Sequence, residues 1–131
     1  PRSLFVAKFL GTPPINVFRG EVKREMLLLD GQPVLPVKGA ADQQVWAGIR
    51  PEGFLPCPDG PLACRLERIE VMGRDISVIS SHNSCEGQTV RSIISGETRV
   101  DTASPQVRFS LKPQKVFLFS RDAGERIRFS Y

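Results

Sequence analysis

Closely spaced turn residues are the feature that most limits how this sequence can fold. The 131 residues include 11 glycines and 11 prolines, which divide the apolar runs after residue 16 into short segments. Apolar and polar residues alternate within these segments, as in Val107, Phe109 and Leu111, which are separated by polar side chains. Short alternating segments predict half-buried β-strands. Many such strands with turns between them predict a small barrel or sandwich.

Several local signals refine this prediction. The pair Asp30-Gly31 tolerates positive φ and predicts a hairpin. Pro33 and Pro36 cannot donate to a ladder, so their strand is expected at a sheet edge. The apolar positions step out of alternation after Leu66, which predicts a β-bulge. The expected strands cover residues 17–23, 26–29, 33–37, 44–50, 64–72, 76–80, 90–94, 99–100, 107–111, 116–119 and 127–131.

The first residues have a different character. Arg2 to Leu10 contains no glycine and no proline, Gly11 stands where a left-handed cap would end a helix, and Pro13 follows. This predicts a short helix, apolar nearly all round, which must pack on something else because so short a helix is marginal alone. The chain begins with Pro instead of Met, and we expect it to be a piece of a longer protein.

Composition narrows the class of protein. The chain is 40% hydrophobic and 24% charged, as in an ordinary globular domain. No apolar run approaches the roughly 20 residues that span a bilayer, and no signal peptide is evident. Three cysteines do not make a disulfide framework, so we expect reduced thiols and a cytosolic protein. The net charge of +4 permits anionic partners without requiring them.

Enzyme and metal chemistry find little support in the sequence. No glycine-rich loop ends in Gly-Lys-Ser or Gly-Lys-Thr, so the chain has no phosphate cradle for nucleotide hydrolysis. Cys57, Cys64, His82 and Cys85 do not have the spacing of a structural zinc site. The simpler interpretation is three unrelated thiols and a histidine in a surface loop.

A nucleophilic triad would have to use His82, the only histidine, with Ser80, Ser81 or Ser84. No nucleophile elbow accompanies these residues, so we expect no catalysis here. Nucleic-acid binding has more support, because basic and aromatic residues interleave at 108–109, 117–121 and 126–129. The competing interpretation is that these aromatic residues alternate inward and build the core.

Four segments resemble one protein family. The segment Leu4 to Asn16, LFVAKFLGTPPIN, resembles the junction where the nucleotide-binding domain ends in ATP-binding subunits of sugar-type ABC importers. Gly48 to Glu52, G-I-R-P-E, resembles the signature of their C-terminal regulatory domain. These two segments, together with two later ones that follow in the same order as in the family, resemble importers of the maltose, sugar and glycerol-phosphate type.

The later segments fit the same family. Glu70 to Gly73 resembles its E-x-L-G turn, with methionine in place of the usual leucine. Residues 118–127 resemble the closing L-F-D-x-x-T-G-x-R-I strand pair, with Ser120 at the usual aspartate and Ala123 at the usual threonine. The matching segments span Leu4 to Ile127.

The resemblance implies a specific fold and division of the chain. It implies a mainly β protein with a small barrel like the oligonucleotide/oligosaccharide-binding (OB) fold, the transport-associated OB domain, and a short N-terminal helix. Residues 1–12 would be the last helix of a nucleotide-binding domain, and 13–131 the regulatory domain. The motif residues are Gly11, Pro13, Asn16, Gly48, Arg50, Pro51, Glu52, Gly73, Phe119 and Gly124.

Structural roles for the G-I-R-P-E segment follow from its residue types. Gly48 would let backbones approach closely inside the barrel. Arg50 is expected to form a bidentate pair with Glu52 or Glu70. Pro51 is expected to end the strand.

The resemblance also implies a function. The parent protein would bind ATP and Mg²⁺ in another domain, form dimers, and drive sugar uptake through membrane-spanning permease subunits at the inner face of the membrane. This chain would hold no cofactor or metal and catalyse nothing. It would join two copies and receive a regulatory protein, with nucleic acid not expected as a partner. The alternatives are a free-standing OB module that binds single-stranded nucleic acid and a sensor that binds a sugar or an anion at the barrel mouth.

Overall fold

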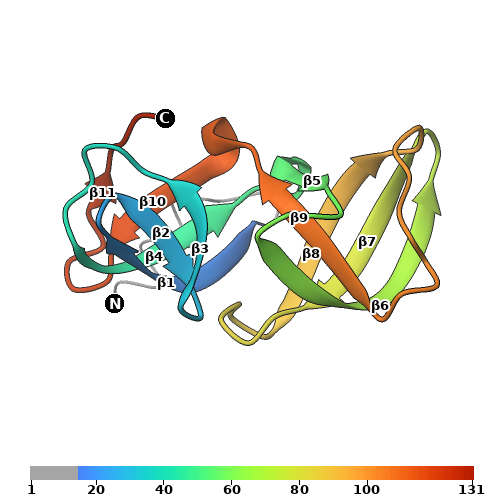
Figure 1. The fold of residues 1–131 in the computed structure, drawn as a ribbon, viewed down its shortest axis with the longest axis horizontal. Helices are drawn as coiled ribbons and strands as arrows, with labels where there is room; N and C mark the ends of the chain where they lie inside the picture. The colour runs from blue at the N-terminus through green and yellow to red at the C-terminus, as the bar shows by residue number, and fades with distance from the viewer. Residues whose placement is uncertain (1–14) are drawn as a thin grey trace.

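The computed structural model describes residues 15–131, which form β-strands and two short 3-10 turns arranged in two lobes (Figure 1). The predicted helix over residues 2–10, together with Gly11 and Pro13, lies outside the described residues. The elements are β1 (Asn16–Lys23), β2 (Met26–Leu29), β3 (Gln32–Pro36), β4 (Gln43–Ile49), η1 (Pro51–Gly53), β5 (Phe54–Pro56), β6 (Leu62–Met72), β7 (Asp75–Ser81), β8 (Thr89–Ser95), β9 (Gln106–Leu111), η2 (Pro113–Lys115), β10 (Val116–Ser120) and β11 (Arg126–Ile127).

A six-stranded antiparallel sheet forms one lobe, in the order β11-β10-β4-β1-β2-β3. β3 is an edge strand, as its two prolines predict. The two ends of the sheet meet just beyond its outer strands, because Lys38 and Ser130 exchange two backbone hydrogen bonds of 2.9 Å. This contact curls the sheet into a barrel.

A five-stranded antiparallel sheet forms the other lobe, in the order β5-β9-β6-β7-β8. η1 packs beside the edge strand β8, and β5, the strand at the other edge of the sheet, also contacts β8. The predicted mainly β, barrel-like fold is therefore confirmed, although the strands are divided between two sheets. The chain crosses from one sheet to the other at η1 and returns at η2, and each crossing begins with a proline, Pro51 and Pro113.

One hydrophobic core runs through both lobes. Phe18 and Leu118 are fully buried in the six-stranded sheet, and Phe54 and Phe109 meet edge to face in the five-stranded sheet with ring centroids 5.2 Å apart. Because the buried set is continuous, the lobes are parts of one packed body.

Local sequence signals mostly gave the right elements. Asp30 and Gly31 turn the β2–β3 hairpin with φ of 52° and 77°, and the β6–β7 ladder shifts register just after Leu66. The strand predicted at 99–100 is wrong, because that segment is a loop from which Val100 packs against the core. The last predicted strand, over residues 127–131, is reduced to the short strand β11, and beyond it only Ser130 forms a single bridge, to Lys38.

Candidate functional site at the junction of the two sheets

The two chain crossings pair with each other. The backbone N–H of Arg50 donates to the Lys115 carbonyl at 3.1 Å, and the N–H of Lys112 donates to the Gly53 carbonyl at 2.9 Å. A Cβ on Gly53 would lie 2.8 Å from the Cβ of Lys115, so only glycine allows this approach. β4 ends at Ile49, and Pro51 begins η1 after one intervening residue, close to the strand end predicted for it.

The ion pair predicted for Arg50 is wrong. Among residues 15–131, Glu52 pairs instead with Lys115 at 3.7 Å and Glu70 pairs with Arg68 at 2.9 Å. The Arg50 guanidinium lies over the ring of Phe117, 5.4 Å from its centroid. Phe117 stands beside Arg50 because β10 and β4 are neighbouring strands, whereas η1 turns Glu52 toward η2.

The Phe117 ring has a second arginine. The guanidinium of Arg126, on β11, lies 5.0 Å from the ring centroid. In the order β11-β10-β4, Arg126 lies on β11 and Arg50 directly follows β4, so the two arginines come from the two sides of β10. Burial lowers the pKa of Arg126, and the charge of Arg128 lowers it further.

Asn16 ties the two sheets together through its side-chain amide. Its Nδ2 donates to the carbonyls of Ile49 at 3.0 Å and of Arg91 at 2.9 Å, and the Arg91 N–H donates to its Oδ1 at 2.8 Å. Ile49 lies on β4 and Arg91 on β8, so one buried side chain serves both lobes.

The loop between β7 and β8 adds further ties to β1. The Arg19 N–H donates to the Ser84 carbonyl and the Glu86 N–H donates to the Val17 carbonyl, both at 2.8 Å. The Arg19 side chain pairs with Glu86 at 2.6 Å and also donates to the Asn83 carbonyl at 2.6 Å. β1 is therefore shared by the two lobes.

The remaining motif residues lie in turns and in the sheet. Gly73 turns the β6–β7 hairpin with φ of 65°. Gly124 has φ of 71° in the β10–β11 turn, where its N–H donates to the Ser120 carbonyl at 2.8 Å. Phe119 on β10 is completely buried. Gly48 is buried in register with Val17 and Phe117, and its role in close backbone approach stays a prediction.

Ser120 acts as a cap although aspartate is usual at its position in the resembled motif. Its Oγ accepts hydrogen bonds from the N–H groups of Ala123 at 3.3 Å and Glu125 at 3.1 Å. These bonds hold the β10–β11 turn that Gly124 makes possible.

Within residues 15–131, no group of three or more His, Cys, Asp or Glu side chains could hold a metal ion. Of the candidate serines, Ser84 places its Oγ 2.8 Å from the Nδ1 of His82. Cys64 and Cys85 are buried, which raises their pKa to about 12 and about 11. His82 is half-buried, not simply a surface-loop residue, and burial lowers its pKa. The His82 Nδ1 accepts a hydrogen bond from the Ser84 N–H at 3.1 Å, and the His82 ring packs edge-on against the Phe18 ring with their centroids 5.8 Å apart. His82 therefore helps to shape the β7–β8 loop.

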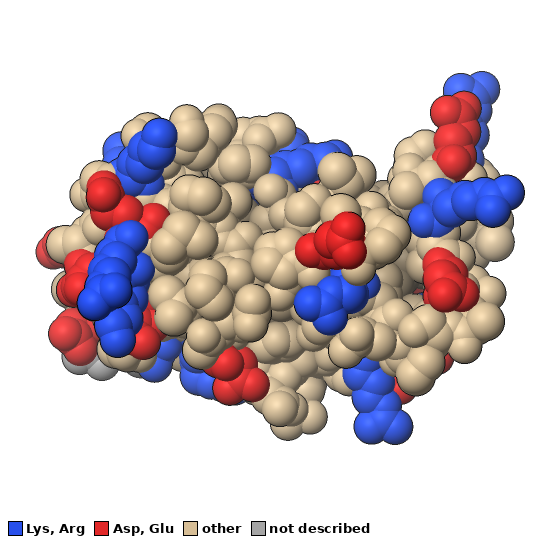
Figure 2. Space-filling view, in the orientation of Figure 1, with Lys and Arg blue, Asp and Glu red and all other residues tan. Residues whose placement is uncertain are grey.

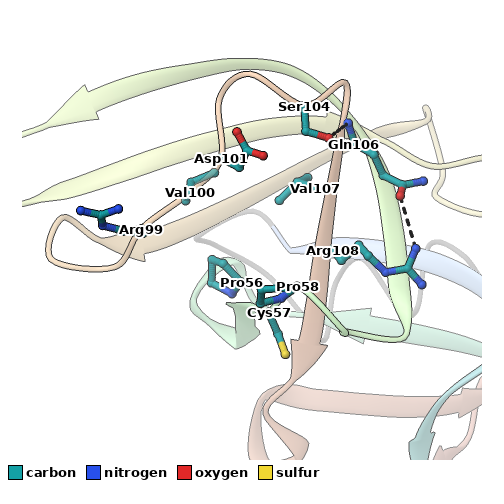
Figure 3. A pocket seen from close by; sticks show the side chains of 10 residues that line it. All are labelled: Pro56, Cys57, Pro58, Arg99, Val100, Asp101, Ser104, Gln106, Val107 and Arg108. Carbon is teal, nitrogen blue, oxygen red and sulfur yellow. Dashed lines mark hydrogen bonds between the residues drawn. The ribbon is translucent and has the colours of Figure 1, made fainter.

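A cavity of about 290 Å³ opens in the five-stranded lobe (Figure 3). Its two arginines do not converge: Arg99 and Arg108 lie on opposite sides of the cavity in this view. Arg108 is held by the Gly60 carbonyl at 2.9 Å and the Gln106 Oε1 at 3.3 Å. The cavity therefore has a mixed apolar and polar lining, and its two arginines do not form a convergent set for a sugar or an anion.

One face of the molecule shows no broad patch of a single charge. Positive and negative side chains are interleaved on the face shown in Figure 2. Phe109 and Phe119, from the segments in which basic and aromatic residues alternate, are completely buried and cannot stack on bases. Within residues 15–131, no helix has the length and apolar character needed to cross a membrane.

Sequence reasoning missed the junction as a whole. Gly53, Lys115 and the side-chain bonds of Asn16 had no local signal that linked them. A usable hint was the repeated pattern of a proline two residues after the end of a strand, at Pro51 and Pro113, which marks both crossings.

Comparison with known proteins gives a consistent result. No family model matches the chain. Three similar proteins are named sn-glycerol-3-phosphate import ATP-binding protein UgpC: from Jannaschia sp. (strain CCS1), 34% identical over 129 residues; from Ruegeria sp. (strain TM1040), 30% over 129 residues; and from Shigella sonnei (strain Ss046), 30% over 135 residues. Each match covers 97% of this chain, which spans only 36 to 37% of each relative's length. The matches confirm the resemblance predicted from the sequence motifs.

Proposed function

We propose that this chain, which is similar along almost its whole length to part of the ATP-binding subunits of glycerol-phosphate-type ABC importers, is a regulatory domain of such a subunit. The observation that carries the proposal is the extent of the match, which covers 97% of the chain. The imported solute would be glycerol 3-phosphate or a related carbohydrate.

The proposed division of labour leaves ATP hydrolysis to another domain of the subunit. ATP and Mg²⁺ would be bound there, because the 131 residues contain no glycine-rich phosphate loop. The described residues therefore do not fit an ATP site. The chain itself would be non-catalytic, and the whole subunit would act in the cytoplasm against membrane-spanning permease subunits.

The contribution of this chain would be to join two subunits through contact with a second copy and to receive a regulatory protein. The β6–β7 hairpin supports an interaction role. Val71 and Met72, next to its turn, are 80% and 53% exposed, although both are large apolar side chains. Exposed apolar residues that cluster are typical of interaction surfaces.

Sedimentation velocity over a range of concentrations tests the joining role. We expect a reversible dimer, weakened by the double variant Val71→Glu, Met72→Glu. Leu55→Glu, at a 44% exposed apolar residue on β5, is the matched control and should leave the association unchanged. A strict monomer at high concentration would refute the joining role.

Uptake measurements test the transport assignment separately. The full-length subunit, expressed in cells that lack their own glycerol 3-phosphate importer subunit, should restore uptake of labelled glycerol 3-phosphate or of a related sugar. Failure with every such solute, with the subunit present at the membrane, would argue against this family role.

A further inference from the structure

A second apolar cluster lies on the outer side of the six-stranded sheet, separate from the main core. Side chains alternate along β4, so Val45 and Ala47 join the core while Trp46 projects the other way. Phe119 on β10 belongs to this second cluster. We call the surface the outer face, and it consists of Ile15, Val17, Trp46, Gly48, Phe117 and Phe119.

The outer face is covered although it projects away from the core. Phe119 is 0% exposed, and the Nε1 of Trp46 is buried. Gly48 is buried as well, in register between Val17 on β1 and Phe117 on β10. Because glycine has no side chain, it leaves a trough between these two neighbours, and a glycine in a strand often marks the close approach of another segment.

Guanidinium groups supply part of the cover. Arg121 lies 5.4 Å from the centroid of the Trp46 ring, and Arg50 lies 5.4 Å from that of Phe117. These groups stack on the two rings of the face. The burial of Phe119 calls in addition for an apolar partner, because the removal of apolar surface from water is what favours such packing.

The chain itself carries an apolar segment close to this face. Ile15, the first described residue, packs against Phe119, so the chain enters the described fold at the outer face. The preceding segment Leu4 to Leu10, LFVAKFL, contains one polar residue, Lys8. Residues 11–14 extend at most about 14 Å, so this segment cannot lie far from Ile15.

We propose that the outer face is the docking site of the chain's own segment Leu4 to Leu10, in the same molecule. As the helix expected from its sequence, the segment would be about 10 Å long, and the three neighbouring strands β10, β4 and β1 span about 10 Å. The short link gives an effective concentration in roughly the millimolar range, so the segment of a second copy competes poorly. This docking does not require the regulatory role proposed above.

The fluorescence of Trp46, the only tryptophan, reports directly on the outer face. In the 131-residue chain, the double variant Phe5→Ser, Phe9→Ser should shift the emission to longer wavelength and raise acrylamide quenching several-fold, because water then reaches the ring. Lys8→Ser is the matched control, since it changes the polar residue of the same segment, and it should leave both signals unchanged. Circular dichroism checks that the β-sheets of each variant are folded.

Gly48→Leu tests the same contact from the side of the sheet. A leucine at this position fills the trough and displaces the segment, so the urea midpoint should fall. Because Gly48→Leu and the Phe5→Ser, Phe9→Ser variant break one shared contact, their effects on the midpoint should not add. Fully additive effects, or a midpoint that Gly48→Leu does not lower, would show that the segment does not bind there.

Dilution distinguishes the two possible occupants of the face. Docking in the same molecule predicts that the Trp46 emission and quenching stay constant over the protein concentrations at which sedimentation velocity follows association. A change on dilution would assign the face to a second copy and overturn the proposal. Unchanged Trp46 signals in the Phe5→Ser, Phe9→Ser variant, or an equal change in Lys8→Ser, would overturn it too.

Discussion

Removal of the Asn16 side chain is the most informative perturbation of the junction. The residue is 6% exposed, and its amide makes three hydrogen bonds of 2.8 to 3.0 Å to Ile49 and Arg91. Each bond contributes about 0.5–1.5 kcal/mol, and a buried group left without a partner costs about 1–3 kcal/mol. Asn16→Ala leaves the Arg91 N–H without its hydrogen-bond acceptor, so we expect a loss of about 2–4 kcal/mol in the free energy of unfolding.

Urea denaturation measures this loss, with the fluorescence of Trp46, the only tryptophan, as the signal. The midpoint should fall while the slope stays constant, because the surface exposed on unfolding hardly changes. In thermal melts the same loss should lower Tm by about 5–15 °C for a chain of this size. Asn83→Ala is the matched control, since only the backbone carbonyl of Asn83 is used, and should change stability by less than about 0.5 kcal/mol.

Asn16→Asp separates hydrogen-bond chemistry from packing volume. Aspartate keeps an acceptor for the Arg91 N–H but faces the carbonyls of Ile49 and Arg91 with an oxygen instead of a donor. At neutral pH this variant should be at least as unstable as Asn16→Ala, and it should partly recover in acid, where a protonated carboxyl donates one bond. An Asn16→Asp protein as stable as the unmodified chain, or an Asn16→Ala loss below about 0.5 kcal/mol, would refute the reasoning.

Four other outcomes follow from the structure. Ellman's reagent should modify Cys57 alone in the native chain, because burial raises the pKa of the other two thiols to about 12 and about 11; modification of all three without unfolding would contradict this. Burial lowers the pKa of His82 in the folded state. The contribution of His82 to the free energy of unfolding is therefore fully present above the ordinary histidine pKa of about 6.5, and it is lost as the pH falls through the lower, folded-state pKa. The stability of His82→Gln should depend less on pH over that interval, and parallel pH profiles would count against it. Ser92→Ala should be neutral or stabilising by up to about 1 kcal/mol in urea melts, because the buried Ser92 hydroxyl finds no hydrogen-bond partner among residues 15–131; a clear loss of stability would contradict this. Ser120→Ala should lower the free energy of unfolding by about 1 kcal/mol, because it removes two capping hydrogen bonds, and Ser120→Asp should not lower it. An unchanged stability of Ser120→Ala would contradict a capping role.

The local parts of the fold were predictable because short-range chemistry determines them. A two-residue turn needs positive φ, and Asp30-Gly31 supplies it. A strand with Pro33 and Pro36 cannot sit inside a ladder, and β3 lies at the edge. The division into two sheets was not predictable in this way, because it depends on η1 and η2 pairing across about sixty residues of chain.

The candidate site shows the same limit. Arg50 and Glu52 are close in sequence, so an ion pair was a natural expectation, but η1 sends Glu52 to Lys115 and leaves Arg50 beside Phe117. The contact depends on β10 lying next to β4, which no local pattern encodes. The resemblance to importer subunits agrees with the similar proteins found by comparison, while the contact that Arg50 makes had to come from the geometry.

The junction also bears on how the two lobes act together. β1 bonds to β4 along one edge, while its other edge bonds first to the β7–β8 loop and then to β2. Asn16 lies at the start of this strand, and Gly48 and Pro51 lie in or just after its neighbour β4. Because the lobes cannot separate without exposing the shared core, they should unfold in one cooperative transition. The hydrogen bonds of Asn16 therefore join the two lobes at this boundary, whereas Val71 and Met72 of the β6–β7 hairpin are exposed.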